Sequence, residues 1–148
     1  MQDCMVFVFD IDGVLLDREG ESIRSIGVEA LRWAVEHGAV YIISGRSSRD
    51  KGFILDLLKS VEVRVGGIED VLMRVPGDRR GEVDVKREYL LEVLSREGCI
   101  LEVHDDNPRV LDASRRIVKG GLVLHYDNTC EAIYGRSIIP ACSGGGGS

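Results

Sequence analysis

The chain has little that would place it at a membrane or outside the cell. Within its 148 residues no apolar run approaches the roughly 20 residues that a membrane-spanning helix needs. The start, MQDCMVFVFD, has no basic segment before its apolar stretch, so no signal peptide is expected. Positive charge is also in short supply, because 19 Lys and Arg stand against 25 Asp and Glu, for a net charge of −6. A basic protein that coats nucleic acid is excluded, although a local basic patch is not. We expect a cytoplasmic domain.

Cysteine is scarce and irregularly spaced. The four cysteines, Cys4, Cys99, Cys130 and Cys142, form no CxxC pair, a spacing that many metal and redox centres use. We therefore expect reduced, inert thiols rather than metal ligands or a disulfide.

The composition is typical of one folded domain, since 44% of the residues are hydrophobic and 30% are charged. We assign residues 1–142 to this domain, with an irregular tail at 129–142. The final SGGGGS, residues 143–148, has the composition of a flexible linker or a cloning remnant.

Short apolar runs alternate with segments of helical periodicity. This alternation predicts an α/β fold in which a parallel sheet has helices on both faces. The expected strands are 5–9, 39–43, 61–65, 100–103 and 122–125. The expected helices are 25–37, 51–59 behind an Asp50 cap, 84–97 behind an Asp84 cap and 108–119, with a further short helix at 68–74. In the helix 51–59 the inward stripe is Phe53, Ile54, Leu57 and Leu58.

Polar residues follow the first, second and fourth expected strands. Ligands of such sheets bind outside the carboxyl ends of the strands, so we expect these residues to share one edge. Lys86, in the first turn of a helix that descends from this edge, joins them. Taken singly, each Asp is an ordinary turn former or helix cap, and only their convergence indicates a site. The residues are Asp10, Asp12 and Gly13 after the first strand, Ser44, Gly45 and Arg46 after the second, and Asp105 and Asp106 after the fourth.

The chemistry of this set favours phosphate and a divalent cation. Carboxylates gathered at one edge repel one another, and a cation relieves the repulsion. Clustered hard oxygens suit Mg²⁺, and a carboxylate also serves as a nucleophile that forms an aspartyl-phosphate. A lysine near a helix N-terminus is unfavourable by itself, so Lys86 indicates an anionic partner. Ser44 and the backbone N–H groups after it offer donors to phosphate oxygens.

The motifs and their order resemble those of the haloacid dehalogenase-like (HAD) phosphatases. FDIDGVLLD is similar to the first motif of that family, IISGR to the second, Lys86 to the third and HDD to the fourth, over residues 5–127. The resemblance implies a three-layer Rossmann-like fold with a five-stranded sheet of order 5-4-1-2-3. It implies Asp10 as nucleophile, Asp12 as general acid and then base, and Ser44 and Lys86 as phosphoryl ligands. Mg²⁺ would be held by the Asp10 carboxylate, the Asp12 carbonyl and a carboxylate from Asp105 or Asp106.

The connections between elements leave no room for a large cap domain, so we expect an open site that admits a bulky substrate. Within the family, residues 73–94 and 104–117 resemble the 3′-phosphatase domain of phage-type polynucleotide kinase-phosphatases, although the kinase GxxxxGK[ST] loop is absent. The resemblance implies a polynucleotide 3′-phosphatase, alone or with repair or ligation partner enzymes. Guanidinium groups at the rim suit flanking phosphodiesters. The expected rim residues are Arg18, Arg46, Arg74, Arg79, Arg80 and Arg109, and Gly45 is a further expected substrate-binding residue.

Two other functions stay open. A capless sugar-acid phosphatase of the KDO 8-phosphate type also carries DxDGVL and SGR, but its fourth motif continues as GDDxxD. This chain has His104 before Asp105, and Arg109 in place of the last Asp. A HAD-like protein that only binds is disfavoured by the intact Asp10–Asp12 pair and by Lys86. The sequence separates neither DNA from RNA ends nor a 3′-monophosphate from a cyclic phosphate, and the oligomeric state is open. We expect His104 to pack in the core or at its edge.

Overall fold

The computed structural model describes residues 3–118 and 121–126, and these form an α/β fold around a parallel sheet of five strands. The strand order is β3-β2-β1-β4-β5, which from the opposite edge reads as the expected 5-4-1-2-3. Phe9 of β1 lies level with Ile42 of β2 and with His104 of β4, so the carboxyl ends of the three central strands are adjacent. The strands are β1 (Val6–Phe9), β2 (Ala39–Ser47), β3 (Ile68–Arg74), β4 (Glu102–Asp105) and β5 (Leu122–His125).

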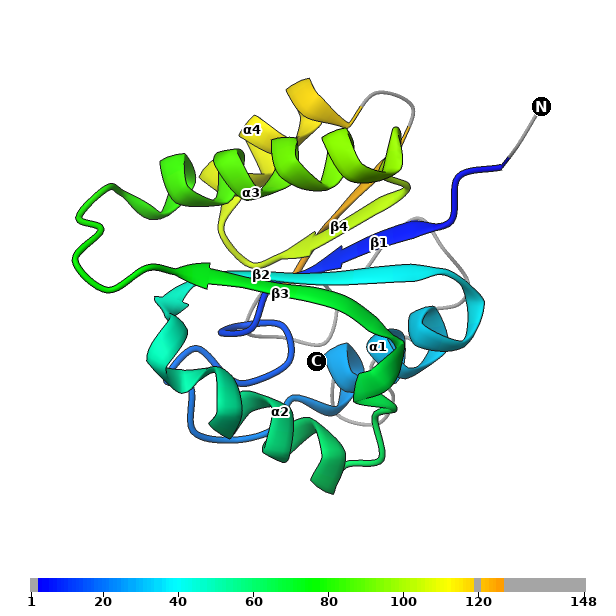
Figure 1. Cartoon of the computed structure of the whole chain (residues 1–148), viewed down its shortest axis with the longest axis vertical. Coiled ribbons are helices and arrows are strands. Elements are labelled where there is room, and N and C mark those ends of the chain that lie inside the picture. The colour runs from blue at the N-terminus through cyan, green and yellow to red at the C-terminus, as the bar shows by residue number, and fades with distance from the viewer. Residues whose placement is uncertain (1–2, 119–120, 127–148) are drawn as a thin grey trace, which may run out of the picture.

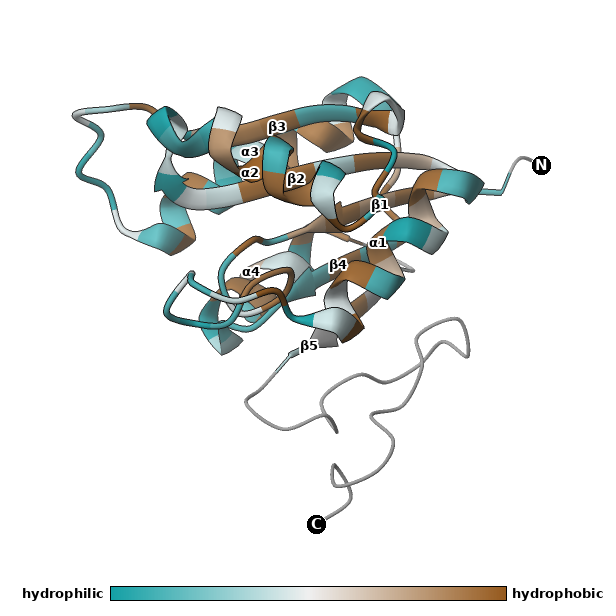
Figure 2. Ribbon diagram, turned by 90° about the horizontal axis from the view of Figure 1, so that it is seen from below, coloured by the Kyte–Doolittle hydropathy of each residue, from teal (hydrophilic) through white to brown (hydrophobic). Residues whose placement is uncertain are grey.

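Helices cover both faces of the sheet, as Figure 1 shows, with α1 and α2 on one side and α3 and α4 on the other. Successive residues of β1 serve the two sides in turn, because side chains of a strand alternate between faces. Phe7 and Phe9 belong to the core under α1 and α2, whereas Val6 and Val8 belong to the core under α3. Figure 2 shows apolar colour along β1 and β2, in the middle of the sheet. The helices are α1 (Ser25–His37), α2 (Lys51–Ser60), α3 (Glu82–Glu97) and α4 (Pro108–Ile117).

The prediction of the third strand is wrong. The strand is Ile68–Arg74, where a short helix was expected, and residues 61–65 are not a strand. Burial alternates along β3, with Val71 and Met73 buried, which is the two-residue period of a strand. Residues 61–63 instead close the end of α2, where the N–H of Val63 donates to the carbonyl of Leu58 at 3.0 Å.

Several boundaries also differ from expectation. β2 continues to Ser47, because β3 pairs beside it as far as Arg74, so Ser44, Gly45 and Arg46 lie on the strand rather than after it. β4 begins at Glu102 and includes Asp105. α4 ends at Ile117, before the expected residue 119. At its start Asn107 is the N-cap, whose side chain accepts from the N–H of Arg109.

The N-terminal caps of α2 and α3 differ from the prediction, and α2 buries fewer of its apolar side chains than expected. α3 begins at Glu82 behind Gly81, so Asp84 is no cap. Asp50 makes no cap hydrogen bond to α2; its carboxylate accepts from Arg46 instead. α2 buries Ile54 and Leu58, which are four residues apart, while Phe53 lies about 100° further round the helix and is 55% exposed.

The expectation of reduced cysteines is wrong for two of the four. Cys4, before β1, and Cys99, after α3, form a disulfide across a sequence separation of 95 residues. The spacing of these cysteines in the sequence does not predict the bond, because only the fold brings the start of β1 beside the turn that leads to β4. Disulfides are rare in the reducing cytoplasm of mesophiles, so this bond does not support the cytoplasmic expectation.

The connections around the site are short. Residues 10–24 join β1 to α1 and residues 75–81 join β3 to α3, and the second loop projects beyond the sheet (Figure 1). Neither segment forms a cap domain. Among the helices that the structure describes, none is long and apolar enough to cross a membrane. The tail at 129–142 and the linker at 143–148 lie outside the described residues and stay predictions.

Candidate active site at the carboxyl edge of the sheet

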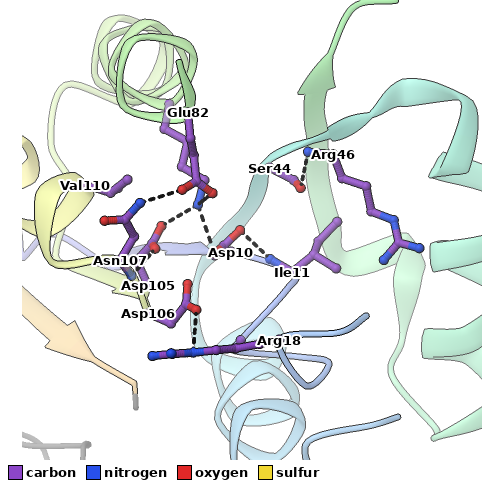
Figure 3. Close-up of polar contacts among 12 residues, drawn as sticks. Asp10, Ile11, Arg18, Ser44, Arg46, Glu82, Asp105, Asp106, Asn107 and Val110 are labelled. Atoms are coloured by element: carbon purple, nitrogen blue, oxygen red, sulfur yellow. Dashed lines mark hydrogen bonds and ion pairs between the residues drawn. The ribbon is translucent and has the colours of Figure 1, made fainter. Parts of the chain in front are cut away.

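A buried lysine and three carboxylates form the centre of the site (Figure 3). The Nζ atom of Lys86 lies 2.9 Å from Oδ2 of Asp10, 2.9 Å from Oδ2 of Asp105 and 3.1 Å from Oε2 of Glu82. Asp10 directly follows β1, Asp105 ends β4, and the other two residues lie on α3. The structure therefore brings together the residues that the sequence predicted after the first and fourth strands, with Lys86 between them.

Burial of Lys86 is tolerated because these carboxylates surround it. The side chain is 0% exposed, and an unpaired charge at that depth would be strongly unfavourable. Burial by itself lowers a lysine pKa, but the charges of Asp10 and Asp105 outweigh it, so the pKa of Lys86 is raised and the ammonium stays charged. Since α3 begins at Glu82, Lys86 lies in its second turn and not the first.

Glu82 is a site residue that the sequence analysis missed. It lies four residues before Lys86, a spacing that places two helical side chains on one face, and its other oxygen accepts from the side chain of Asn107. Asn107 in turn donates its backbone N–H to Asp105 at 2.9 Å. The spacing of Glu82 and Lys86 was the available signal.

Asp106 completes a group of carboxylates that could hold a cation. One oxygen from each of Asp10, Asp105 and Asp106 lies within 4.8 Å of the others. The side chain of Asp106 lies against Gly13, where a Cβ would be 2.2 Å from Oδ2 of Asp106 and where φ is +89°. Gly13 is therefore required both for its left-handed backbone and for the close approach of this carboxylate.

The donor set fits a hard divalent cation. It consists of carboxylate oxygens, which Mg²⁺ prefers, and one oxygen from each of the three aspartates lies close enough to the others to share one ion. Burial and the nearby charge of Asp105 raise the pKa of Asp10 well above its usual range, against the opposing charge of Lys86. Burial likewise raises the pKa of Asp105. A bound cation would favour the ionised form of both groups.

Asp12 lies at the outer side of this centre and carries its own arginine. Its Oδ1 atom is 3.0 Å from Nη1 of Arg46, and Nε of Arg46 is 2.7 Å from Oδ2 of Asp50. Burial raises the pKa of Asp12, with Arg46 opposing the shift. Gly20, in the flap between β1 and α1 (residues 10–24), lies close to Asp12 and Arg46. A Cβ at this position would be 2.7 Å from Oδ1 of Asp12.

The predicted phosphate and substrate ligands divide into inner and outer positions. Ser44 is buried, and its Oγ atom accepts from the N–H of Arg46 at 2.9 Å. Arg18 is held at the site, with Nε 3.3 Å from Oδ2 of Asp106. Arg79 and Arg109 are exposed on the 75–81 loop and at the start of α4.

Arg74 fixes the loop that carries Arg79 and Arg80. Its Nε atom donates to the carbonyl of Gly45 at 2.7 Å, and its Nη1 atom donates to the carbonyls of Asp78 at 3.1 Å and Arg80 at 2.6 Å. Arg80 pairs with Asp78 and lowers the pKa of that carboxyl to about 2. Arg74 is thus a structural residue and not a free phosphate ligand.

A buried hydrogen-bonded chain lies behind the site. His104 contacts Glu102 through Nε2 at 2.9 Å and the Tyr126 hydroxyl through Nδ1 at 2.8 Å, and its ring stacks on Phe9. The backbone of His104 accepts from the N–H of Asp10, and that of Asp105 accepts from Tyr126. Burial lowers the pKa of His104, which keeps the ring neutral. The prediction that His104 packs in the core is confirmed.

The site opens into a cavity of about 400 Å³. It is bordered by the flap, by the start of α3 and by the turn before α4. The lining residues are Asp12, Arg18, Glu82, Asp106, Asn107 and Pro108.

Among solved structures, the chain is similar in fold to chains in two structures of the Pnkp1/Rnl/Hen1 RNA repair complex. Each match has a TM-score of 0.69 and 21% sequence identity over 83% of this chain, and covers 43% or 46% of the other chain. This chain therefore spans less than half the length of those it matches. At this identity the likeness shows the fold alone. No protein-family model matches the chain, and no curated protein is similar to it in sequence.

Proposed function

We propose that this protein is a Mg²⁺-dependent phosphomonoester hydrolase that acts through an aspartyl-phosphate on Asp10. One observation carries the proposal: Asp10, Asp105 and Lys86 converge at the carboxyl edge of the sheet, with Asp12 beside them. A buried carboxylate that faces an ammonium and further carboxylates suits phosphoryl transfer, which depends on positioning and charge stabilisation. The strand order and the four motif positions support membership of the HAD phosphatases.

In the first step, an oxygen of Asp10 attacks the phosphorus of the substrate. The bond between phosphorus and the leaving oxygen breaks, and the protonated Asp12 carboxyl gives its proton to that oxygen, releasing an alcohol. Burial raises the pKa of Asp12, which suits a carboxyl that must carry a proton at working pH. Lys86 and Ser44 bind the transferring group.

In the second step, Asp12 takes a proton from a water molecule, whose oxygen attacks the phosphorus. The bond between phosphorus and Asp10 breaks, so phosphate leaves and Asp10 returns as a carboxylate. Asp10, the Asp12 carbonyl and Asp105 or Asp106 would hold Mg²⁺, which when bound neutralises charge on the phosphoryl oxygens.

The substrate we propose is the 3′-phosphate of a nucleic-acid end. The short connections leave the site open to a chain, Arg18 and Arg46 lie at it, and Arg79 and Arg109 are exposed nearby. The fold is shared with chains of an RNA repair complex, which supports a role in end repair with partner enzymes.

The test is a phosphate-release assay on oligonucleotides with 3′-phosphate, 5′-phosphate or 2′,3′-cyclic ends, beside sugar-acid phosphates. We expect 3′-phosphate ends to be preferred, and Asp10→Asn to abolish release while leaving the fold intact. Asp112→Asn, at an exposed residue of α4 that pairs with Arg115, is the matched control and keeps full activity. A preference for sugar-acid phosphates would favour the alternative function, a sugar-acid phosphatase. Release above about a tenth of the normal rate by Asp10→Asn would exclude covalent catalysis at that residue, and failure of every phosphomonoester would favour a binding module.

A further inference from the structure

Phe53 is a large aromatic side chain that the fold leaves in solvent. Its exposed fraction is 55%, and the other exposed large hydrophobic residues in the described part of the chain are Val75 and Leu91. The core under α2 is filled by Ile54 and Leu58 instead. Packing therefore gives no reason for an aromatic ring at this position.

Arg46 joins this ring to the active site. Its guanidinium carbon lies 6.0 Å from the centre of the Phe53 ring, while its Nη1 atom lies 3.0 Å from Asp12. Asp50 holds the same guanidinium at 2.7 Å, so two carboxylates fix its position. The Arg46 guanidinium thus lies near both the exposed ring and Asp12.

The chemistry of the site says which part of a substrate lies there. In the proposed reaction Asp12 protonates the leaving oxygen, so the nucleoside that carries this oxygen lies on the Asp12 side of Asp10. Arg46 contacts Asp12, and the Phe53 ring lies beside Arg46. An aromatic face next to a guanidinium is a favourable surface for a nucleobase and its neighbouring phosphate.

We propose that Phe53, with Arg46 beside it, forms a stacking subsite for the base of the nucleoside whose phosphate is removed. This inference rests on the proposed function and deepens it, because it makes the base part of what the enzyme recognises. Stacking is tolerant of base identity, since every base has an aromatic face. The subsite therefore selects nucleotides over sugar phosphates without selecting a sequence.

The experiment compares two oligonucleotide 3′-phosphates that differ only in the last residue, which either carries its base or is abasic. The ratio of kcat/KM for the two substrates reports the contribution of the base. We expect a ratio of roughly 5- to 150-fold for the unmodified enzyme, the range for one stacked base. Phe53→Leu should bring the ratio close to one, and Phe53→Trp should restore or increase it.

Leu91→Ala is the matched control, because Leu91 is a similarly exposed apolar residue on α3, and its ratio should equal that of the unmodified enzyme. A second measurement needs no turnover: in an Asp10→Asn background, the fluorescence of Phe53→Trp should fall when the base-bearing oligonucleotide binds, and not with the abasic one. A ratio unaffected by Phe53→Leu would overturn the subsite and leave the phosphatase standing. Failure of the unmodified enzyme to release phosphate from any 3′-phosphate substrate would instead refute the proposed function.

Discussion

Removal of the disulfide between Cys4 and Cys99 should lower the free energy of unfolding strongly while leaving the candidate active site intact. The bond joins residues 95 apart in sequence, so breaking it frees a long loop in the unfolded chain. For a loop of about 100 residues, the loss of chain entropy is worth about 4.7 kcal/mol at 25 °C. This is a large part of the 5–15 kcal/mol that stabilises a typical domain.

The perturbation is the double variant Cys4→Ser with Cys99→Ser, followed by circular dichroism during heating without reductant. At ~2–4 °C per kcal/mol for a chain near this size, we expect Tm to fall by roughly 10–20 °C. A reductant should lower the Tm of the unmodified protein by a similar amount and leave the Tm of the double variant unchanged. Cys130→Ser, at a cysteine that takes no part in this bond, serves as control.

Activity of the double variant, measured well below its Tm, should stay close to normal. Cys4 precedes β1 and Asp10 follows it, so the bond and the site lie at opposite ends of that strand. A Tm within about 2 °C of the unmodified protein would contradict the loop-entropy argument. Recovery of Cys4 and Cys99 as free thiols from the native protein would contradict the bond itself.

Four further predictions concern the site. Asp12→Asn should slow phosphate release from alkyl phosphates by about 10²–10⁴-fold. Release from aryl phosphates should slow much less, since an aryl oxide leaves without a proton, and an equal loss for both substrates would argue against a general acid. A chelator should abolish activity, Mg²⁺ should restore it, and Ca²⁺ should inhibit because its looser coordination misplaces Asp10; full activity in chelator would contradict the metal site. Gly13→Ala should weaken Mg²⁺ binding in calorimetry, because its Cβ would lie 2.2 Å from the Asp106 carboxylate; unchanged affinity would remove Asp106 from the ligand set. Replacing Arg79 and Arg80 by Ala should reduce the gain in kcat/KM with oligonucleotide length at low salt, and an undiminished gain would exclude them from phosphodiester contacts.

The sequence predicted the positions of the candidate site residues better than the bounds of the elements that carry them. Asp10, Lys86 and Asp105 could be placed at one edge because a parallel sheet brings the carboxyl ends of its strands together. Glu82 was missed because the expected helix began at residue 84, whereas α3 begins at Glu82. The contacts of Tyr126 depend on β4 lying beside β5, which no local pattern reveals.

The errors in the fold have a similar origin. Residues 61–65 and 68–74 are both apolar enough for a strand, and only pairing with β2 selects the second. Phe53 was expected to be buried because periodicity shows which residues could share a face of α2, but not how wide a stripe the sheet covers. The disulfide depends on a contact across 95 residues, beyond any local signal.

The clamp formed by Arg74 makes the 75–81 loop a replaceable unit. Because this one side chain holds the carbonyls of Asp78 and Arg80 and ties them to Gly45 of β2, the loop is anchored through backbone atoms at these three residues. Positions such as 76 and 79 are therefore free to vary in charge and size while the strand and helix on either side keep their places. For the proposed phosphatase, substrate preference would then change by exchange of a few loop residues, while Asp10 and its neighbours keep their positions.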